Sequence, residues 1–469
     1  MANSAPDRGP ELLLELRSVD GRLRAQVEQG LRDAIRAGRL TPGARLPASR
    51  VLAADLGVSR RLISDAYEQL RTEGWLEARQ GAGTWVATGA TKQAAGAGGS
   101  AAPTAKRRPR YDFFPGVPDL AGFPRSAWAR AVRDALRVVP DADLGYADQR
   151  GPLGLRRELA AYLRRARGLN VDPEALVICS GAMQAVTLLA RVLVRTGRAR
   201  IAVEDPSLGV LTGALAHAGA DVLPVTVDQH GLDINALDSV GADAVLVTPA
   251  HQFPTGVPLA RDRRLALVEW AAEGRVIIED DYNAEFRYDR PAISSLQGLA
   301  PDRIAHIGTV SKALAPGLRI GWLVLPAHLT DDLLQERMYA DGGPPVIDCL
   351  ALSQLLSAGE YDRHLRAARR RYRARRESLE LAVARELPRC ELTGVPGGLH
   401  APVQLPEPVD AGHLVQAATK LDTAIYPLAW FFRSPPTMTD SVVLGYGNLP
   451  SAAINEGVRR FAQALRKTS

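Results

Sequence analysis

The stretch TVSKALAPGLRIGW, residues 309–322, places one lysine between two short apolar runs, IAHIGTV before it and IGWLVLP after it. Lysine is scarce here: only five occur in 469 residues, and Lys312 is the only one between positions 107 and 419. Arginine supplies nearly all the positive charge, so this position needs something that arginine lacks. A lysine amine can attack a carbonyl carbon, which a guanidinium group cannot usefully do.

Similar apolar runs recur throughout residues 111–469. They are ALVICSG, RIAVEDP, DAVLVTP, RVIIEDDY, IAHIGTV and IGWLVLP, each bounded by turn signals or by helical patterns. Buried apolar strands that alternate with helices predict an α/β fold with a mostly parallel central sheet flanked by helices. In such folds, the residues that bind ligands lie just beyond the strand ends.

Three polar clusters occupy that position: SGAMQAV at 180–186, IIEDDYNAEFRY at 277–288, and the lysine stretch itself. The first is a small-residue turn that leads into a helix, and free N–H groups at a helix N-terminus bind phosphate. The second offers three consecutive carboxylates at 279–281, one of which can pair with a pyridinium nitrogen. Together with Lys312, these clusters predict a site for pyridoxal 5′-phosphate.

Composition sets the wider frame. A chain of 469 residues predicts two or three units, and 46% hydrophobic with 5% aromatic residues is typical of an ordinary soluble protein. No apolar run approaches twenty residues and the start, MANSAPDRGP, is polar, so we expect no membrane segment and a cytoplasmic location. The three cysteines, without a CxxC pair, predict reduced thiols, and we expect no metal site.

Charge is distributed unevenly along the chain. Residues 1–110 hold 18 Lys+Arg and 11 Asp+Glu, a net charge of +7, which leaves −1 for residues 111–469. This asymmetry predicts a polyanion-binding module attached to a near-neutral body. Residues 88–110 are rich in Ala, Gly, Ser and Thr without hydrophobic periodicity, which predicts a flexible linker between the two.

The basic module has a helical beginning. Leu23, Val27, Leu31 and Ile35 form a helical stripe, and the Pro-Gly pair that follows ends it. Residues 48–75 then predict two short helices, the second capped by Ser59, and LEARQGAGTWVA predicts a hairpin. This order is a winged helix-turn-helix, whose second short helix would enter the major groove of DNA.

Residues 21–87 resemble the GntR family of bacterial regulators. The matching motifs are G-x-L-x-P-G-x-x-L-P, S-R-x-L-A-x-x-L-G-V-S-R and A-Y-x-x-L-x-x-E-G, and we place the DNA-binding domain at 12–87. The resemblance implies that double-stranded DNA is contacted by Arg50, Ser59, Arg60, Arg61 and Ser64, with Arg79 and Gln80 on the wing. Arginine suits this task because its planar fork grips phosphate or guanine bidentately.

Residues 111–469 resemble the fold-type I aminotransferase-like proteins, which bind pyridoxal 5′-phosphate and carry a smaller C-terminal α+β part. The tandem of GntR head, linker 88–110 and aminotransferase body resembles the MocR/GabR regulators. Further marks of that group are YADQRGPLGLRRELAAYL, TPAHQFPTGV, HLRAARRRYRARR and GGLH.

That resemblance implies roles for single positions. Lys312 would be the Schiff-base lysine, Asp280 the partner of the pyridine nitrogen, and Tyr282 the partner of the ring hydroxyl. The positions that would hold the phosphate are Ser180, Gly181, Ala182, Ser311 and Arg319. Tyr146 matches a tyrosine that the partner subunit contributes, which implies a homodimer. His251 lies in a TP-x-H-Q loop near the ring, with either a ligand contact or a structural role.

The sequence departs from the family pattern near the substrate. Gln252 completes the TP-x-H-Q loop, and Phe253 follows where many aminotransferases carry asparagine. Leu208 stands where an aromatic ring usually stacks on the cofactor, and Val443 stands where an arginine usually clamps the α-carboxylate of an amino acid. A valine cannot pair with a carboxylate, which puts transamination in doubt unless Arg433 compensates.

These observations favour a transcriptional regulator whose aminotransferase-like body is a sensor, and pyridoxal 5′-phosphate itself is one effector considered. An amino acid or an amine is the other effector considered. The alternatives are a working aminotransferase that carries a DNA-binding head, and a body that only dimerises with the cofactor as a structural element.

Overall fold

The computed structural model of the protein describes residues 23–79, 83–88, 109–146, 148–169, 171–283, 285–289, 293–406 and 410–468. They divide into two compact units, an N-terminal one described from residue 23 to 88 and a C-terminal one described from residue 109 to 468. The predicted linker at 88–110 lies almost entirely outside the described residues. No helix in the described parts is long and apolar enough to span a membrane.

Three helices and a hairpin build the N-terminal unit. They are α1 (Leu23–Arg36), α2 (Ser49–Asp55), α3 (Arg60–Thr72), β1 (Leu76–Arg79) and β2 (Gly83–Val86). The predicted stripe of α1 is buried at Val27, Leu31 and Ile35, in a core shared with α2, α3 and both strands. The hydroxyl of Ser59 accepts a hydrogen bond from the backbone N–H of Leu62 at 3.2 Å, which caps α3. The predicted winged helix-turn-helix is confirmed.

An eight-stranded sheet lies at the centre of the C-terminal unit, in the order β4-β11-β10-β9-β8-β5-β6-β7. The strands are β4 (Leu176–Cys179), β5 (Arg200–Asp205), β6 (Asp221–Asp228), β7 (Gly231–Leu232), β8 (Ala244–Val247), β9 (Val276–Asp280), β10 (Ile304–Thr309) and β11 (Gly321–Val324). The run from β10 through β9, β8 and β5 to β6 is parallel, whereas β11 is antiparallel to both β10 and β4. The six predicted runs all lie in this mixed sheet.

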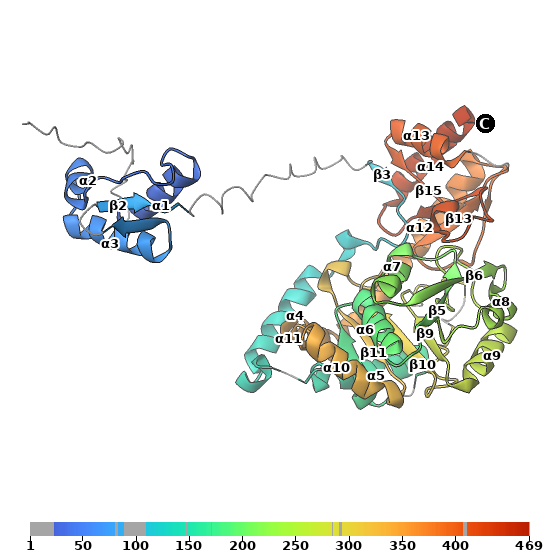
Figure 1. Cartoon of the computed structure of the whole chain (residues 1–469). Helices are drawn as coiled ribbons and strands as arrows, with labels where there is room; N and C mark the ends of the chain where they lie inside the picture. Colours follow the sequence, from blue (N-terminus) through green and yellow to red (C-terminus); the bar gives the residue numbers. More distant parts are fainter. Residues whose placement is uncertain are drawn as a thin grey trace, which may run out of the picture. The chain divides into compact units, whose positions relative to one another are not determined.

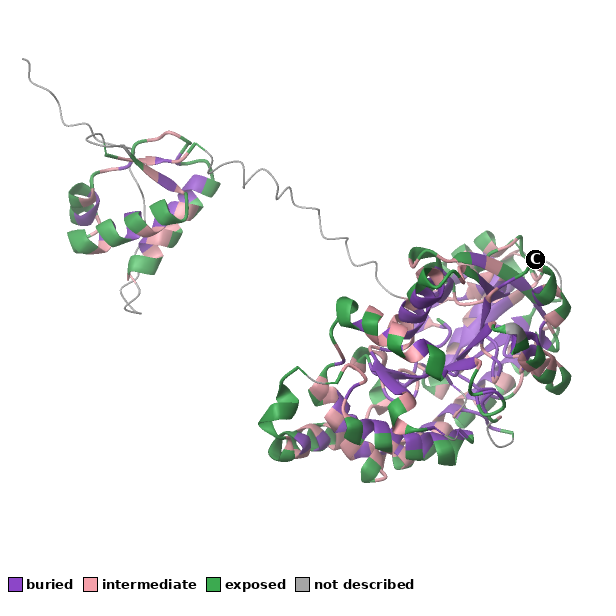
Figure 2. Ribbon diagram, turned by 60° about the horizontal axis from the view of Figure 1, so that its bottom comes forward, coloured by how far each residue is buried: buried purple, intermediate pink, exposed green. Residues whose placement is uncertain are grey.

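Helices cover both faces of the sheet (Figure 1). They are α4 (Arg125–Val138), α5 (Leu153–Arg167), α6 (Ala182–Arg195), α7 (Gly209–His217), α8 (Ile234–Ser239), α9 (Arg261–Trp270), α10 (Ala327–Ala340) and α11 (Val346–Ser357). Alternate residues of β4 face opposite cores: Leu176 and Ile178 pack with α5 and α11, and Val177 and Cys179 pack with α6. The sheet is therefore buried on both faces, as Figure 2 shows by its purple strands.

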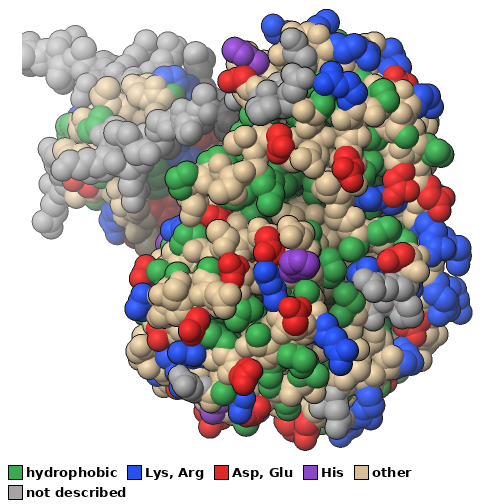
Figure 3. Space-filling view, turned by 90° about the vertical axis from the view of Figure 1, so that its right-hand side faces the viewer, with side chains coloured by type: hydrophobic (Ala, Val, Ile, Leu, Met, Phe, Trp, Pro, Cys, Tyr) green, Lys and Arg blue, Asp and Glu red, His purple; other side chains and the backbone are tan. Residues whose placement is uncertain are grey.

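A smaller α+β part follows at the C-terminal end, drawn in orange and red in Figure 1. Its elements are α12 (Glu360–Glu386), β12 (Glu391–Leu392), β13 (His400–Gln404), α13 (Ala411–Lys420), β14 (Thr423–Ala424), β15 (Tyr426–Pro427), β16 (Ser441–Gly445) and α14 (Ser451–Thr468). Four strands form a sheet in the order β12-β13-β16-β15, and β14 pairs in parallel with β3 (Tyr111–Asp112) from the start of the unit. Figure 3 shows the side of this unit that carries α8 and α9, where acidic and basic side chains are interspersed.

Candidate functional site

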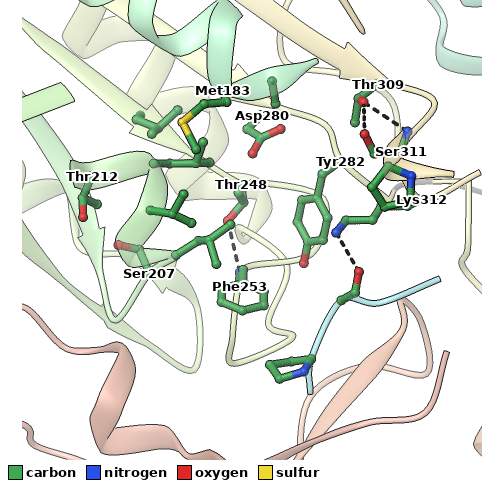
Figure 4. Close-up of a pocket in the computed structure, with 18 of the residues that line it drawn as sticks. Met183, Ser207, Thr212, Thr248, Phe253, Asp280, Tyr282, Thr309, Ser311 and Lys312 are labelled. Carbon is green, nitrogen blue, oxygen red and sulfur yellow. Dashed lines mark hydrogen bonds between the residues drawn. The ribbon is translucent and has the colours of Figure 1, made fainter. Parts of the chain in front are cut away.

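A cavity of about 350 Å³ lies where the parallel strands of the central sheet end. Its wall includes Asp280 at the end of β9, Thr309 at the end of β10 and Thr248 just after β8 (Figure 4). This is the edge at which ligands bind in open α/β sheets. Of the ten positions expected to hold the cofactor, six are on the wall: Ala182, Asp280, Tyr282, Ser311, Lys312 and Arg319.

Lys312 projects into the cavity from the segment after β10 (Figure 4). Its Nζ donates a hydrogen bond to the carbonyl oxygen of Gly116 at 2.6 Å. Burial lowers the pKa of the Lys312 ammonium, and only the attraction of Asp280 opposes that shift. A lowered pKa increases the fraction of neutral amine, which is the form that attacks a carbonyl.

Asp280 has a buried carboxyl group, 5% exposed, whose Oδ1 has no hydrogen-bond partner among the described residues. Burial raises the pKa of Asp280 to about 7, and the neighbouring Asp281 adds to that shift. A buried acceptor without a donor is costly, so the native protein is expected to supply one. A protonated ring nitrogen bound in the cavity would satisfy this oxygen.

The two acids beside Asp280 already have other partners. Glu279 accepts a hydrogen bond from the backbone N–H of Leu296 at 2.8 Å and also binds the hydroxyl of Ser295. Asp281 forms a buried ion pair with Arg167, with Oδ2 and Nε 2.7 Å apart. The Oδ1 of Asp281 has no partner among the described residues either, but of these three consecutive acids only Asp280 lies on the cavity wall.

The opposite end of the site is built to hold an anion. The guanidinium group of Arg319 donates to the carbonyl oxygen of Ser180, and its Nη1 would lie 3.2 Å from a Cβ atom placed on Gly181. Gly181 has a φ of 85°, in the left-handed region that favours glycine, and α6 begins at the next residue, Ala182. Free N–H groups of this first turn, the Arg319 cation and the hydroxyl of Ser311 suit a phosphate.

Tyr282 lies on the cavity wall and contacts His251 of the TP-x-H-Q loop. Its hydroxyl donates to the carbonyl oxygen of His251 at 3.1 Å and lies 3.2 Å from Nδ1 of the same residue. His251 is buried behind the wall, and burial lowers its pKa to about 4, which favours the neutral ring. Gln252 is also behind the wall, where its amide donates to the carbonyl oxygen of Pro206 at 2.7 Å. This geometry places both residues as supports of the wall.

No cation faces the remaining part of the described wall. Val443 is fully buried in β16, paired across to Pro402 of β13, and is not on the wall. Arg433 is exposed and is also not on the wall. Its backbone N–H, not its guanidinium group, donates a hydrogen bond to the carboxylate of Asp205. Lys312 and Arg319 are the only basic side chains among the described wall residues.

The wall contains further residues that the sequence did not single out. Glu204, at the end of β5, accepts hydrogen bonds from the backbone N–H and the hydroxyl of Thr248 at 3.1 and 2.5 Å. Burial raises the pKa of Glu204 to about 7. Its position near the end of an apolar strand, like that of Asp280, is the sequence pattern that could have predicted Glu204 as a site residue. Leu208 and Phe253, two of the three departures from the family pattern, line the cavity as well.

Tyr146 does not belong to this cavity. Its side chain is fully exposed on the segment between α4 and α5. A contact between Tyr146 and a bound phosphate would therefore have to involve a second copy of the chain.

The candidate DNA-contact residues lie together at the start of α3 and on α2. Gly57, with a φ of 66°, makes the tight turn between these helices, and all five predicted residues of this region are exposed: Arg50, Ser59, Arg60, Arg61 and Ser64. Arg79 is in β1, of which only the backbone is described at that position, and Gln80 lies outside the described residues.

Comparison with known proteins agrees with both halves of the chain. Residues 23–86 match the gntR family of bacterial regulatory proteins, and residues 117–416 match aminotransferase class I and II. The probable rhizopine catabolism regulatory protein MocR of Rhizobium meliloti is 32% identical over 96% of this chain and 95% of the relative. The chain belongs to the MocR-type regulators.

Two further similarities bear on this MocR-type regulator. The pyridoxine biosynthesis transcriptional regulator PdxR of Corynebacterium glutamicum is 34% identical, over 90% of this chain and 91% of the relative. Alpha-aminoadipate aminotransferase LysN of Thermus thermophilus, solved with N-(5′-phosphopyridoxyl)-L-leucine, superposes with a TM-score of 0.68 at 27% identity, over 76% of this chain and 92% of that one. The MocR-type regulator is thus a DNA-binding transcription regulator with an aminotransferase-like body, and its cofactor is pyridoxal 5′-phosphate.

Proposed function

We propose that this MocR-type regulator senses pyridoxal 5′-phosphate itself, with the C-terminal unit as the sensor and DNA binding as the output. The observation that carries the proposal is the charge of the described wall, whose only cations, Lys312 and Arg319, both occupy cofactor positions. A buried carboxylate without a paired cation costs several kcal/mol, so an amino acid in the usual pose would bind poorly. Since it acts on DNA, the regulator is expected to work in the cytoplasm.

The residues divide between the two ends of the cofactor. When bound, pyridoxal 5′-phosphate supplies an aldehyde, and the buried amine of Lys312 is the group placed to bind it covalently. Asp280 would accept the ring N–H and Tyr282 would face the ring hydroxyl. The phosphate would be held by Ser180, Gly181, Ala182, Ser311 and Arg319, with His251 fixing the position of Tyr282 from behind.

Cofactor binding can change DNA affinity only if it favours one arrangement of the regulator over another. Without a ligand, Asp280 is a buried acid with an unsatisfied oxygen, and a bound pyridinium would relieve that cost. Cofactor binding would therefore stabilise the arrangement of the regulator in which Asp280 faces the bound ring. The similarity to a regulator named for pyridoxine biosynthesis supports the same effector.

We also propose that the regulator acts as a homodimer. Large apolar side chains are exposed on α4, α10 and α11, among them Val138 at 71%, Tyr339 at 83% and Ile347 at 42%. Helices α4 and α11 pack against each other, and exposed apolar surface of this kind marks interaction sites. Tyr146, nearby in sequence to α4, would then reach the phosphate of the partner subunit. Sedimentation of the full chain at micromolar concentration tests the dimer.

The effector is tested with DNA that the protein itself selects. Duplexes are enriched from a random library by the full chain, once without the cofactor and once with it. The best duplex is then titrated at several cofactor concentrations. We expect apoprotein and loaded protein to differ at least about tenfold in DNA affinity, a coupling of about 1.4 kcal/mol.

Amino acids and amines provide the alternative arm of that experiment. A flat response to the cofactor, with a strong response of the loaded protein to one amino acid or amine, would overturn the proposal. Rapid conversion of an amino acid to its keto acid would instead favour an aminotransferase that carries a DNA-binding head. The similarity to an aminotransferase and the presence of Lys312 are the observations behind that second candidate.

A further inference from the structure

Helix α12 carries an unusual concentration of arginine. Residues 363–376 contain eight arginines and no acid, although residues 111–469 have a net charge of only −1. Part of this charge is neutralised by ion pairs within the C-terminal unit. Arg371 and Arg375 form ion pairs with the buried Asp119 at 2.8 and 3.2 Å, and Arg376 pairs with an acid one turn later at 2.7 Å.

The other side of α12 faces solvent. Arg363, Arg366, Arg370 and Arg373 follow one another at steps of three, four and three, which places them on one face of the helix, and all four are exposed. Arg363 pairs with an acid at the helix start at 2.8 Å, and Arg373 donates to a backbone carbonyl. Arg366 and Arg370 make no hydrogen bond or ion pair with any described residue.

A hollow of about 290 Å³ adjoins this face, between α12 and the end of α5. Four arginines from the two helices line it: Arg165, Arg167, Arg366 and Arg369. The side chain of Arg167 is 2% exposed, and its Nη2 is a buried donor without a partner among the described residues. The hollow therefore presents donors to an anion from its floor as well as from its rim.

Two acids, Asp362 and Glu285, share the same hollow with the four arginines and offset only part of their charge. Asp362 is already engaged by Arg165, with Oδ2 and Nη2 2.6 Å apart. Burial raises the pKa of Glu285, which favours the neutral acid, and Tyr162 donates to it at 3.1 Å. An anion in the hollow would meet an excess of positive charge.

We propose that this arginine face, formed by Arg165, Arg363, Arg366 and Arg370, binds the phosphate backbone of duplex DNA beside the segment held by the N-terminal unit. These exposed guanidinium groups, of which Arg366 and Arg370 have no partner among the described residues, match a row of phosphates, and arginine grips phosphate bidentately.

The length of the connection limits how far the DNA held by the N-terminal unit can lie from the C-terminal unit. The last described residue of the N-terminal unit is 88 and the first of the C-terminal unit is 109, so the connection spans at most about 70 Å even when fully extended. Tethering of this kind gives the DNA a high effective concentration at the body. Phosphate contacts of this kind add affinity and register, and carry no sequence information.

The test compares two double variants of the full chain, Arg366→Gln with Arg370→Gln, and Arg191→Gln with Arg261→Gln. The second pair is the matched control, because both arginines are exposed and make no hydrogen bond or ion pair with any described residue. Binding to a fluorescein-labelled 40-bp duplex of mixed sequence is measured from about 0.05 to 0.3 M salt. Melting temperature and cofactor absorbance verify that both variants fold.

Each phosphate contact contributes about 0.9 to the slope of log affinity against log salt. We expect the first variant to lose about 1.8 from that slope and to bind roughly 10- to 60-fold more weakly at 0.1 M salt. The control variant should keep the slope of the natural protein. Equal slopes for the two variants would overturn the proposal and leave the arginine face as a solvated surface only.

Discussion

Replacing Asp280 with asparagine gives two opposite results, one for the stability of the apoprotein and one for cofactor affinity. Burial raises the pKa of Asp280 from its ordinary value of 3.8 to about 7. A group with a raised pKa binds more protons in the folded chain than in the unfolded one, so stability falls as pH rises between these two values. Above pH 7, the folded apoprotein must keep a buried, unsatisfied carboxylate charged.

The pKa change limits the size of the effect. Each pKa unit is worth about 1.4 kcal/mol, so the rise from 3.8 to about 7 costs at most about 4 kcal/mol above pH 7. The asparagine amide is also buried without a partner, at a cost of about 1–3 kcal/mol. We therefore expect the Asp280→Asn apoprotein to be more stable than the natural one by about 1–2 kcal/mol at pH 8, with no gain at pH 4.

The assay is thermal unfolding of the apoprotein at pH 4, 6 and 8, followed by absorbance titration with pyridoxal 5′-phosphate. Removing one partner of a buried charge pair costs about 2–5 kcal/mol, so cofactor affinity should fall at least about 30-fold in the same variant. Asp281→Asn is the matched control. It strips the buried Arg167 of its carboxylate partner, so we expect that variant to lose about 3–5 kcal/mol of stability.

Equal destabilisation by the two substitutions at pH 8 would refute the reasoning, because it would mean that Asp280 has a partner in the apoprotein. Unchanged cofactor affinity in Asp280→Asn would refute it in a second way, since the ring nitrogen would then not bind to this carboxylate. A gain in stability without a loss of affinity is thus as damaging as no gain at all.

Three further variants test other parts of the regulator. Borohydride reduction of the loaded protein, followed by peptide mapping, should place a pyridoxyl group on Lys312, and Lys312→Ala should carry none; modification of another lysine would remove Lys312 from its role. Gly181→Ala should weaken cofactor binding about tenfold or more in absorbance titrations, because its Cβ would lie 3.2 Å from the Arg319 guanidinium and its φ of 85° disfavours alanine; unchanged affinity would contradict the phosphate site. Arg60→Ala should cost about 1–3 kcal/mol of DNA affinity in anisotropy measurements, whereas Arg71→Ala, at the far end of α3 and paired with Glu68, should cost little; equal losses would exclude a specific contact of Arg60.

Much of the fold follows from local patterns. The helical stripe of α1 and the Ser59 cap of α3 depend on residues within one or two turns, so the sequence predicts them directly. The six apolar runs of the body are all strands for the same reason. Strand β6 escaped prediction because Pro224 interrupts it and exposed residues alternate with buried ones, which is also the pattern of a surface loop.

The site is predictable to the extent that strand ends are. Asp280 is the last residue of an apolar strand and Lys312 lies shortly after another, and both side chains reach the cavity as expected. His251 and Arg433 lie in longer connections, whose paths depend on tertiary contacts rather than on local sequence. His251 contacts Tyr282 from behind the cavity wall, and Arg433 binds Asp205 through its backbone N–H. No local sequence pattern predicts either contact.

Asp280 and Val443 affect the stability of the folded apoprotein in different ways. At the cofactor end, the chain keeps a buried acid with an unsatisfied oxygen, which destabilises the apoprotein and is compensated only when a cationic group binds. Away from the cavity wall, Val443 is a fully buried apolar side chain of β16, at a position where an arginine would need a carboxylate partner to be tolerated. An enzyme would need one buried charge for its cofactor and another for its substrate, since both arrive charged. The proposed sensor of the cofactor alone would need only the first.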